Sequence, residues 1–301
     1  MTLELYDQFT MNGGLVDLSS RAKFRLTGND RVRYLNGQVT NDVRLATATE
    51  ALYACVTDAK GRIAGDVFIH IDGDSLLIDA EPGLRDTLAT RLERYIVADD
   101  VVLEDVTEDF SLWHMFAGVT VLSRVEGSVR QVGNSVRLGI PGADLWLPAS
   151  ASHPLLSGPV LSAEDFEALR ILRGIPRWPN ELGGDVFPQE AGLETRAMSF
   201  TKGCYIGQEV LSRIKSTGRM PRELVRWKAR EMSASFEAGD ELWLEDKAIG
   251  RITSVTRHPS LGSSVGLGFV KQGSAALDSI LLATKGAPSI KARIDISAFV
   301  K

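Results

Sequence analysis

The sequence of 301 residues contains very little cysteine: only Cys55 and Cys204, which lie far apart in the chain. Two isolated cysteines exclude a disulfide framework and a zinc site of the two-plus-two type, and they fit a reducing compartment. The sequence also lacks Cys-x-x-Cys and His-x-x-His pairs. We therefore expect no metal site that the chain builds by itself from a single motif.

Two further absences concern charge and hydropathy. The chain carries 34 basic and 39 acidic side chains, a formal net charge of -5, whereas a generic nucleic-acid binder would show a basic footprint. No apolar run approaches membrane-spanning length, and the N-terminus lacks the basic region and apolar core of a secretory signal. These features predict a cytoplasmic globular protein that does not enter a membrane or bind nucleic acid directly.

The first two thirds of the chain alternate short strands with amphipathic helices, which predicts an α+β region. One helix is clearly delimited, because Ser162 can cap it and Gly174 can end it. His114 and His153 are expected in loops or at the surface. The expected strands are 23–28, 52–56, 62–71, 75–80, 101–106, 118–122 and 145–148, and the expected helices are 29–37, 84–95, 162–174 and 207–218.

The chain changes character after Gly218. From there it consists of short alternating strands separated by glycine turns, which predicts a small β-barrel. We therefore expect two domains, 1–218 and 219–301, joined by the linker 219–222. The expected barrel strands are 224–229, 241–244, 249–255, 265–270, 280–283 and 290–296.

The octapeptide from Lys202 to Glu209, which we call the cysteine loop, concentrates the chemistry of the sequence. It places Cys204 between two glycines and just before a helical pattern. Unpaired N–H groups at the helix start, the helix dipole and the charge of Lys202 would favour a thiolate at Cys204 near neutral pH. The alternative is a small buried thiol in a tight turn, which is a common environment for free cysteine.

The sequence of the cysteine loop, Lys-Gly-Cys-Tyr-Ile-Gly-Gln-Glu, resembles the signature of the YgfZ-like folate-binding proteins. These are relatives of the glycine-cleavage T protein that take part in the maturation of iron-sulfur proteins. The resemblance extends over nearly the whole chain and implies an α+β fold: a T-protein-like folate-binding body of two intertwined lobes plus a small C-terminal β-barrel, arranged around a central channel. The other similar stretches are 34–42, 58–61, 187–193 and 250–254.

The resemblance also implies a binding site for tetrahydrofolate. Glu190 is implied as a hydrogen-bond acceptor for the pterin ring, Arg21 as a partner of the folate glutamate tail, and Phe166 as a ring that stacks on the pterin. An exposed charge at a helix start is the alternative for Glu190. The other folate-binding residues that the resemblance implies are Asp66, Tyr205, Gln208 and Glu209.

One pair of residues separates this chain from the enzymes of the superfamily. T proteins carry two consecutive aspartates in the hairpin that follows the turn 58–61, and the first is assigned the catalytic role. The resemblance places Gly65 at that first position and Asp66 at the second. A glycine has no side chain that accepts a hydrogen bond or stabilises a charge, so this pair counts against aminomethyl transfer.

These features together predict a tetrahydrofolate-binding accessory protein for iron-sulfur cluster assembly or repair, more a non-enzymatic factor than an enzyme. Cys204, activated by Lys202 and the helix start, would serve as a cluster ligand, a sulfur acceptor or a redox thiol. Because such clusters take several cysteine ligands, a partner must supply the others. The resemblance implies A-type iron-sulfur carrier proteins as that partner, and tRNA-modifying radical enzymes as clients further downstream.

Two alternatives stay open. The first is a folate-dependent aminomethyltransferase or another one-carbon transferase, in which Asp66 would replace the missing aspartate. The second is a direct tRNA-binding module, based on the basic side chains of Arg213, Lys215, Arg219 and Arg222. A solvated surface is the plainer interpretation of that cluster, and a steep salt dependence of binding would identify a nucleic-acid contact.

Overall fold

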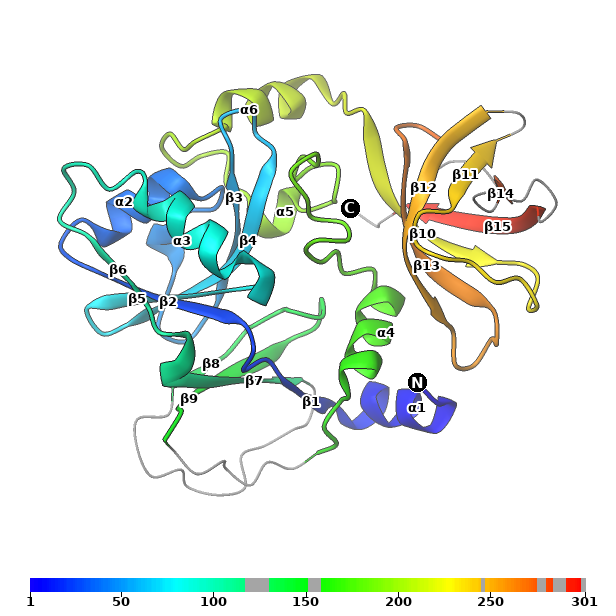
Figure 1. Cartoon of the computed structure of the whole chain (residues 1–301), viewed down its shortest axis with the longest axis horizontal. Coiled ribbons are helices and arrows are strands. Elements are labelled where there is room, and N and C mark those ends of the chain that lie inside the picture. The colour runs from blue at the N-terminus through cyan, green and yellow to red at the C-terminus, as the bar shows by residue number, and fades with distance from the viewer. Residues whose placement is uncertain (117–129, 151–157, 245–246, 275–279, 284–290, 299–301) are drawn as a thin grey trace.

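The computed structural model describes residues 1–116, 130–150, 158–244, 247–274, 280–283 and 291–298. Figure 1 shows a body of sheets and helices beside a barrel, with helix α4 (Ala163–Arg173) and the loop that follows it between them. None of the helices in these ranges is long and apolar enough to cross a membrane. The chain thus has the predicted α+β body and C-terminal barrel.

The larger sheet of the body has five strands in the order β3-β4-β5-β2-β6. All neighbouring strands in it are antiparallel. Helices α2 and α3 cover one face, where Leu35 and Leu88 share a hydrophobic core with Ile69 and Ile78. The elements are β2 (Ala22–Thr27), α2 (Arg31–Gln38), β3 (Leu52–Thr57), β4 (Ile63–Asp72), β5 (Ser75–Ala80), α3 (Arg85–Glu93) and β6 (Val102–Asp105), with 3-10 turns at Val43–Leu45, Pro82–Leu84 and Thr107–Asp109.

The smaller sheet has four strands in the order β1-β7-β9-β8. Strand β1 precedes the larger sheet in the chain and the other three strands follow it, so the two lobes of the body are intertwined (Figure 1). Trp146 and Phe116 lie in the core of this lobe, together with Phe9 from the N-terminal helix. The elements are α1 (Leu3–Asn12), β1 (Gly14–Asp17), β7 (Phe110–Phe116), β8 (Arg130–Val132) and β9 (Gly142–Pro148).

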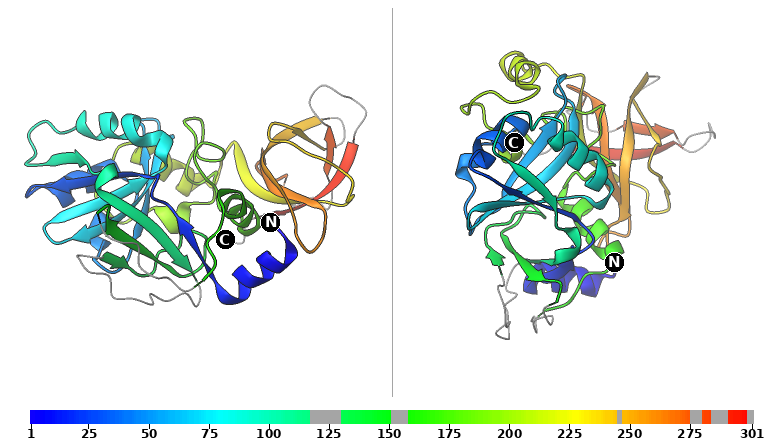
Figure 2. Two further views of the ribbon diagram at one scale, coloured as in Figure 1. Left: turned by 60° about the horizontal axis from the view of Figure 1, so that its bottom comes forward. Right: turned by 60° about the vertical axis from the view of Figure 1, so that its left-hand side comes forward.

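Helix α4 leads from the body toward the barrel. Ser162 caps it by accepting a hydrogen bond from the N–H of Asp165, and Gly174 ends it in a left-handed conformation, as the sequence predicts. Six strands then close a barrel in the order β10-β13-β12-β11-β14-β15, which Figure 2 shows from two sides. The elements are α5 (Glu194–Ala197), α6 (Gln208–Thr217), β10 (Arg222–Ala229), β11 (Glu241–Leu244), β12 (Lys247–Arg257), β13 (Ser264–Lys271), β14 (Ile280–Ala283) and β15 (Lys291–Ala298).

Most elements expected from the sequence are present close to their predicted ranges. Helix α1 is not predicted by the sequence pattern, because Phe9 alone among its residues is buried. The expectation for His114 is wrong, since this residue is fully buried on β7. The expected strand 118–122 and His153 lie outside the described residues.

Candidate functional site

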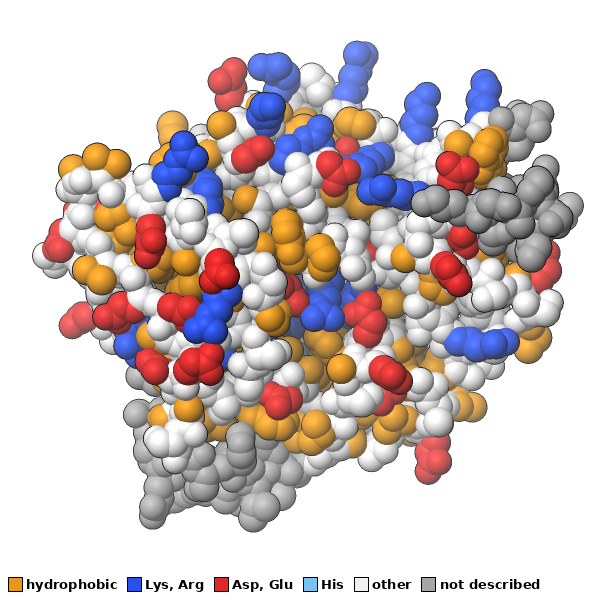
Figure 3. Space-filling view, in the orientation of Figure 1, with side chains coloured by type: hydrophobic (Ala, Val, Ile, Leu, Met, Phe, Trp, Pro, Cys, Tyr) orange, Lys and Arg blue, Asp and Glu red, His pale blue; other side chains and the backbone are white. Residues whose placement is uncertain are grey.

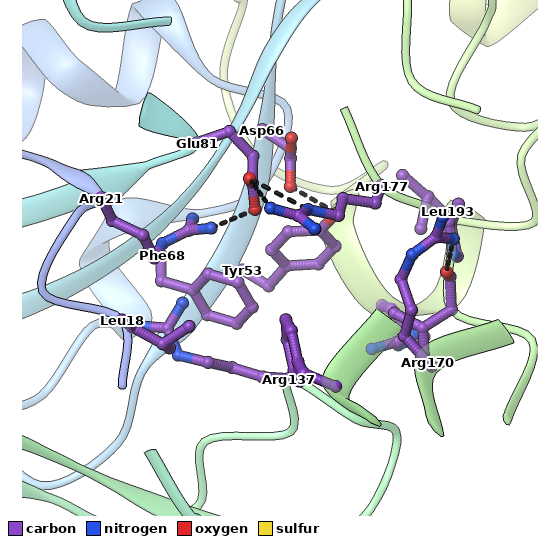
Figure 4. A pocket seen from close by; sticks show the side chains of 14 residues that line it. Leu18, Arg21, Tyr53, Asp66, Phe68, Glu81, Arg137, Arg170, Arg177 and Leu193 are labelled. Atoms are coloured by element: carbon purple, nitrogen blue, oxygen red, sulfur yellow. Dashed lines mark hydrogen bonds and ion pairs between the residues drawn. The ribbon is translucent and has the colours of Figure 1, made fainter. Parts of the chain in front are cut away.

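A small cavity lies between the two lobes of the body and the loop after α4 (Figure 4), and we call it the inner cavity. Three of the predicted folate-binding residues, Arg21, Asp66 and Phe166, line it. The other lining residues are Leu18, Tyr53, Phe68, Glu81, Arg137, Arg170, Ile175, Pro176, Arg177, Leu193 and Arg196.

Strand β4 turns Asp66 toward the inner cavity and Gly65 away from it. A Cβ atom on Gly65 would lie 3.0 Å from Leu84 Cδ1, in the core on the opposite face of the sheet. Successive side chains of a strand point to opposite faces, so an aspartate at position 65 would not enter this cavity. The inner cavity therefore contains the carboxyl group of Asp66, whichever residue stands at position 65.

Asp66 carries a buried carboxyl group with one free oxygen. Its Oδ2 accepts a hydrogen bond of 3.0 Å from the Tyr53 hydroxyl, and its Oδ1 is buried with no partner among the described residues. Burial, reinforced by the charge of Glu81, raises the pKa of Asp66 to about 6. This carboxyl group can exchange a proton near neutral pH, and its free oxygen can accept a hydrogen bond from a ligand.

Arg21 supplies the complementary donor. Its Nε donates to Asp79 Oδ1 at 2.5 Å and its Nη1 donates to Glu81, while Nη2 is buried with no partner in the described part of the chain. Burial opposes the charge of Arg21, but the two carboxylates outweigh burial and raise its pKa. The inner cavity thus offers one free donor from Arg21 and one free acceptor from Asp66.

A buried network of ion pairs continues from Arg21 through Asp79. Arg137 binds Asp79 through both Nη atoms, at 2.9 and 2.6 Å, and its Nη2 also donates to Asp144 at 2.8 Å. His114 Nδ1 lies 2.8 Å from Asp144 Oδ1. Burial disfavours these charges, but their attraction outweighs it, so the pKa of Arg137 is raised and the pKa values of Asp79 and Asp144 are lowered.

Aromatic rings form flat walls in the inner cavity. Tyr53 and Phe68 stack with their centroids 4.7 Å apart, and the guanidinium of Arg137 lies 4.0 Å from the Phe68 centroid. Phe166 adds a third ring. Flat rings beside a donor and an acceptor suit a planar heterocycle. Sequence reasoning missed Tyr53 and Phe68, although strand alternation and pairing place both on the sheet face of Asp66.

The free volume of the inner cavity is only about 50 Å³, which leaves room for a few water molecules. A second cavity of about 290 Å³, which we call the outer cavity, adjoins it. A ligand of the size of folate would fit the inner cavity only if side chains between the two cavities moved. The residues that line both cavities are Leu18, Arg21, Glu81, Phe166 and Arg177.

The cysteine loop lies at the start of α6, at the top of the body in Figure 1. Cys204 is exposed, so the alternative of a buried thiol is wrong. Gly207 precedes the helix with a φ of 87°, and a Cβ atom on it would lie 2.5 Å from the carbonyl oxygen of Asp58. Only glycine therefore allows the loop to approach the turn 58–61 this closely.

Lys202 is buried, and its ammonium group donates to the carbonyl oxygens of Asn36, Val39 and Asn41 at 2.6, 2.7 and 2.7 Å. Burial lowers the pKa of Lys202 to about 8. The three bonds tie the cysteine loop to the C-terminal end of α2, whose last carbonyls need partners. They also use every N–H of the ammonium group, so Lys202 does not activate Cys204 through a hydrogen bond.

The remaining residues of the cysteine loop support the loop itself. Tyr205 is buried beside Phe187, its ring centroid lies 5.0 Å from Lys202 Nζ, and burial raises its pKa to about 12. Gln208 begins α6 and is partly buried, whereas Glu209 is exposed. None of these side chains lines the inner cavity, so their contact with folate stays a prediction.

Glu190, like these residues of the cysteine loop, lies outside the inner cavity. Its side chain is fully buried, so the alternative of an exposed charge is wrong. Its Oε2 accepts a hydrogen bond of 2.9 Å from the N–H of Phe187 and lies 3.5 Å from both Arg62 Nη1 and Arg222 Nε. These contacts hold the loop before α5 against the first barrel strand. The structure does not bring Glu190 to the inner cavity, and its contact with a pterin ring stays a prediction.

Segments that are distant in the sequence build the support of the cysteine loop. The Thr57 hydroxyl donates to the carbonyl oxygen of Ile206 at 2.6 Å, and the N–H of Ile206 donates to the carbonyl oxygen of Gly37 at 3.2 Å. The side chain of Gln189 donates to the carbonyl oxygen of Leu211 at 2.9 Å. The stretches that resemble the T-protein superfamily thus meet around an exposed thiol, and the chain presents two candidate sites: this thiol and the inner cavity.

Within the described residues, the exposed thiol of Cys204 has no cluster of metal-binding side chains around it. Across the ranges that the structure describes, no group of three or more His, Cys, Asp and Glu side chains could hold a metal ion. The second cysteine, Cys55, is fully buried, and burial raises its pKa well above the usual value. Cys204 is thus the exposed one of the two thiols.

Comparisons with known proteins agree with this architecture. Residues 6–116 match the family model of the GCVT N-terminal domain, and residues 222–301 match that of the glycine cleavage T-protein C-terminal barrel domain. The tRNA-modifying protein YgfZ of Yersinia pestis is 30% identical over 249 residues, which cover 76% of this chain and 74% of the relative. The chain belongs to the YgfZ family.

Two further proteins are similar to this chain, one in sequence and one in structure. A putative chloroplastic transferase of Arabidopsis thaliana is 24% identical over 305 residues, covering 91% of this chain and 69% of that protein. The glycine cleavage system aminomethyltransferase T of Bartonella henselae has a TM-score of 0.79 at 16% identity, covering 95% of this chain and 85% of that structure. This second likeness establishes a T-protein-like fold for the YgfZ-family chain.

Proposed function

We propose that this chain is a folate-binding accessory protein for the assembly or repair of iron-sulfur clusters. Tetrahydrofolate would occupy the inner cavity, and Cys204 would be the thiol that meets the cluster. The YgfZ relatives are named as tRNA-modifying proteins. We infer that the chain acts upstream of that modification, by supporting the iron-sulfur enzymes that perform it.

The observation that carries the folate part is the pair of free polar atoms between the rings of the inner cavity. A pterin ring is flat and carries N–H donors next to a carbonyl acceptor. Asp66 Oδ1 can accept from such an N–H and Arg21 Nη2 can donate to such a carbonyl, since both atoms are buried with no partner in the described ranges. The stacked rings of Tyr53 and Phe68 match its flat faces. Bound tetrahydrofolate would supply a carrier of one-carbon units.

The observation behind the cluster part is an exposed thiol on a firmly held loop. The three hydrogen bonds of Lys202 and the close approach of Gly207 fix the loop before any partner arrives. We propose that Cys204 is one ligand of a cluster that a partner, such as an A-type carrier protein, completes with its own cysteines. A sulfur acceptor and a redox thiol are the other roles that an experiment must separate.

Calorimetry with 5-formyltetrahydrofolate tests the folate part. We expect Asp66→Ala to weaken binding at pH 7.5 by about tenfold or more, because a hydrogen bond to a charged group is lost. Asp7→Asn serves as the matched control, since Asp7 is exposed on α1 and lines neither cavity. Unchanged affinity in Asp66→Ala, or no binding by the native chain, would overturn the proposal.

Complementation tests the thiol. A strain that lacks its own YgfZ-family factor should regain the activity of its iron-sulfur enzymes with the native chain, but not with Cys204→Ser or Cys204→Ala. Mass spectrometry of the purified chain distinguishes a sulfur acceptor, which would carry a persulfide, from a cluster ligand. Full rescue by both variants would show that the thiol is not needed.

A second candidate function is a folate-dependent aminomethyltransferase or other one-carbon transferase. The orientation of Asp66 favours it, because this carboxyl group faces the inner cavity with a pKa of about 6, which suits general acid-base chemistry. Turnover of tetrahydrofolate with an aminomethylated carrier protein provides the test. Transfer that disappears in Asp66→Ala would establish the enzyme and displace the accessory role.

A further inference from the structure

A bridge of ion pairs separates the inner cavity from the outer cavity. Glu81 stands at its centre: one carboxylate oxygen accepts from Arg21 Nη1, and the other accepts from Arg177 Nε at 3.0 Å and Nη2 at 2.8 Å. Arg177 Nη1 also donates to Glu167 Oε2 at 3.2 Å. Figure 4 shows the hydrogen bonds between the guanidinium of Arg177 and the carboxylate of Glu81. Arg177 lines both cavities, whereas Asp66 lines only the inner one.

The two arginines of the bridge differ in their freedom to move. The side chain of Arg21 is 8% exposed and is also held by Asp79, whereas the side chain of Arg177 is 36% exposed. The backbone of Arg177 is fixed, since its N–H donates to Glu181 Oε2 at 3.1 Å. An ion pair with one partly exposed partner is weaker than a fully buried pair, and exposed side chains change rotamer rapidly. Rotation of the Arg177 side chain therefore breaks only its bonds to Glu81 and Glu167, whereas Arg21 would also have to leave the buried Asp79.

The volumes of the cavities require such a movement. The inner cavity measures about 50 Å³ and the outer cavity about 290 Å³. A pterin ring can start in the outer cavity, but it reaches Asp66 only if the inner cavity grows. Among the side chains that line both cavities, Arg177 combines partial exposure with contacts to the carboxylate at the boundary. Its rotation would join the two spaces.

We propose that Arg177 is a gate: folate enters through the outer cavity, and its ring reaches Asp66 only after Arg177 releases Glu81. The assignment of folate as the molecule that passes rests on the proposed function. In the closed state Arg177 keeps bulk water away from Asp66 and from the free donor of Arg21. The association rate constant then equals that of a chain with a permanently open cavity, multiplied by the fraction of molecules in which Arg177 has released Glu81.

Chemical access to Asp66 tests the gate without any folate. The free protein is treated with a water-soluble carbodiimide and glycine ethyl ester, and labelling of Asp66 is followed by peptide mass spectrometry. We expect Arg177→Ala to be labelled about tenfold faster than the native chain, as for an open fraction of about one tenth. Arg219→Ala, which removes one exposed positive charge outside both cavities, is the matched control and should label at the native rate. Equal rates in Arg177→Ala and the native chain would overturn the gate.

Stopped-flow binding of 5-formyltetrahydrofolate then separates a gate from a ligand contact. A gate predicts an association rate constant that rises about tenfold in Arg177→Ala. A direct contact between Arg177 and folate predicts an unchanged association rate constant and faster dissociation, which would contradict the proposal. Arg177→Lys keeps one positive charge but loses the several N–H donors of arginine, so its association rate constant should lie between those of the native chain and Arg177→Ala. This variant still tests the gate if Arg177→Ala does not fold. If no variant binds the probe, the folate proposal fails, while the labelling rates still decide whether Arg177 controls access.

Discussion

Tyr53 and Asp66 are diagonal neighbours on adjacent strands, and the Tyr53 hydroxyl donates a hydrogen bond of 3.0 Å to Asp66 Oδ2. This bond favours the ionised carboxylate, yet burial and the charge of Glu81 outweigh it and raise the pKa of Asp66 to about 6. The charge of the inner cavity therefore changes between mildly acidic and neutral conditions. The fold thus keeps a carboxyl group in a place that destabilises its ionised form.

The first prediction concerns the stability of Asp66→Asn. The pKa of Asp66 in the folded chain, about 6, lies above the usual value of 3.8, so the folded state binds more protons between these limits. The stabilising effect of the proton is complete below pH 4 and is lost as the pH rises through 6. At pH 7.5 the ionised carboxylate costs about 3 kcal/mol, which an amide avoids. We expect urea unfolding to show Asp66→Asn more stable than the native chain at pH 7.5.

The comparison at low pH makes this prediction specific. At pH 4 the free energies of unfolding of the two chains should differ by no more than about 0.5 kcal/mol, because Asp66 is protonated in the folded chain and about half protonated in the unfolded chain. Asp7→Asn should match the native chain at both pH values, since Asp7 is exposed. A gain for Asp66→Asn of the same size at pH 4 and 7.5 would contradict the role of the raised pKa.

The second prediction compares two glycines of the cysteine loop. Gly207 has a φ of 87°, and a Cβ atom there would lie 2.5 Å from the carbonyl oxygen of Asp58. Gly203 has no atom within 4 Å of the same position. We expect Gly207→Ala to lower the free energy of unfolding by about 2 kcal/mol or more, and Gly203→Ala to change it by less than about 0.5 kcal/mol. Urea unfolding measures both free energies. Equal losses in the two variants would contradict the prediction, because the turn 58–61 would then move to accommodate the added methyl group.

The sequence predicts those parts of the fold that local chemistry decides. The helix from Ser162 to Gly174 is delimited by its own cap and stop residues, and the alternating strands of the barrel carry their period in the sequence. The position of Cys204 before α6 follows in the same way from Gly207 and the helical spacing after it. These predictions need no knowledge of distant contacts.

Tertiary contacts decide the rest, and local patterns do not contain them. Arg137 binds Asp79, which is 58 residues away, so the local sequence around either residue does not indicate the ion pair. Strand alternation separates Gly65 from Asp66, but only the packing of Leu84 shows that Gly65 faces the helix-covered side of the sheet and Asp66 the inner cavity. Glu190 illustrates the same limit, because its partner Arg222 belongs to the barrel.

The third prediction concerns the two thiols. Cys204 is exposed, whereas Cys55 is fully buried and its pKa is raised well above the usual value by burial. Because the thiolate is the reactive species, a disulfide reagent should titrate one thiol in the native chain and two after unfolding in urea. Cys204→Ser should show none in the native state. A second fast thiol in the folded chain would mean that β3 opens readily around Cys55.

The last prediction concerns the junction of α4 and the barrel. Arg170 Nη2 donates to Ser254 Oγ at 2.8 Å, and Ser254 Oγ donates to Glu181 Oε1 at 2.5 Å, all in a buried environment. Removing the hydroxyl in Ser254→Ala leaves a buried carboxylate oxygen with one partner fewer, which costs about 1 to 3 kcal/mol. Urea unfolding should show this loss. Arg170 also lines the inner cavity, so its bond to Ser254 links the barrel to the cavity wall.

The neighbouring residue on β12 provides the control for this prediction. Thr253 Oγ1 is buried with no hydrogen-bond partner among the residues that the structure describes. Replacing an unpaired buried hydroxyl by a methyl group of the same shape removes a desolvation cost, so Thr253→Val should be neutral or stabilising. The two variants thus change adjacent positions of one strand in opposite directions. A loss in Thr253→Val as large as that in Ser254→Ala would mean that β12 responds to any change in packing, and that the bonds of Ser254 to Arg170 and Glu181 have no special role at the junction.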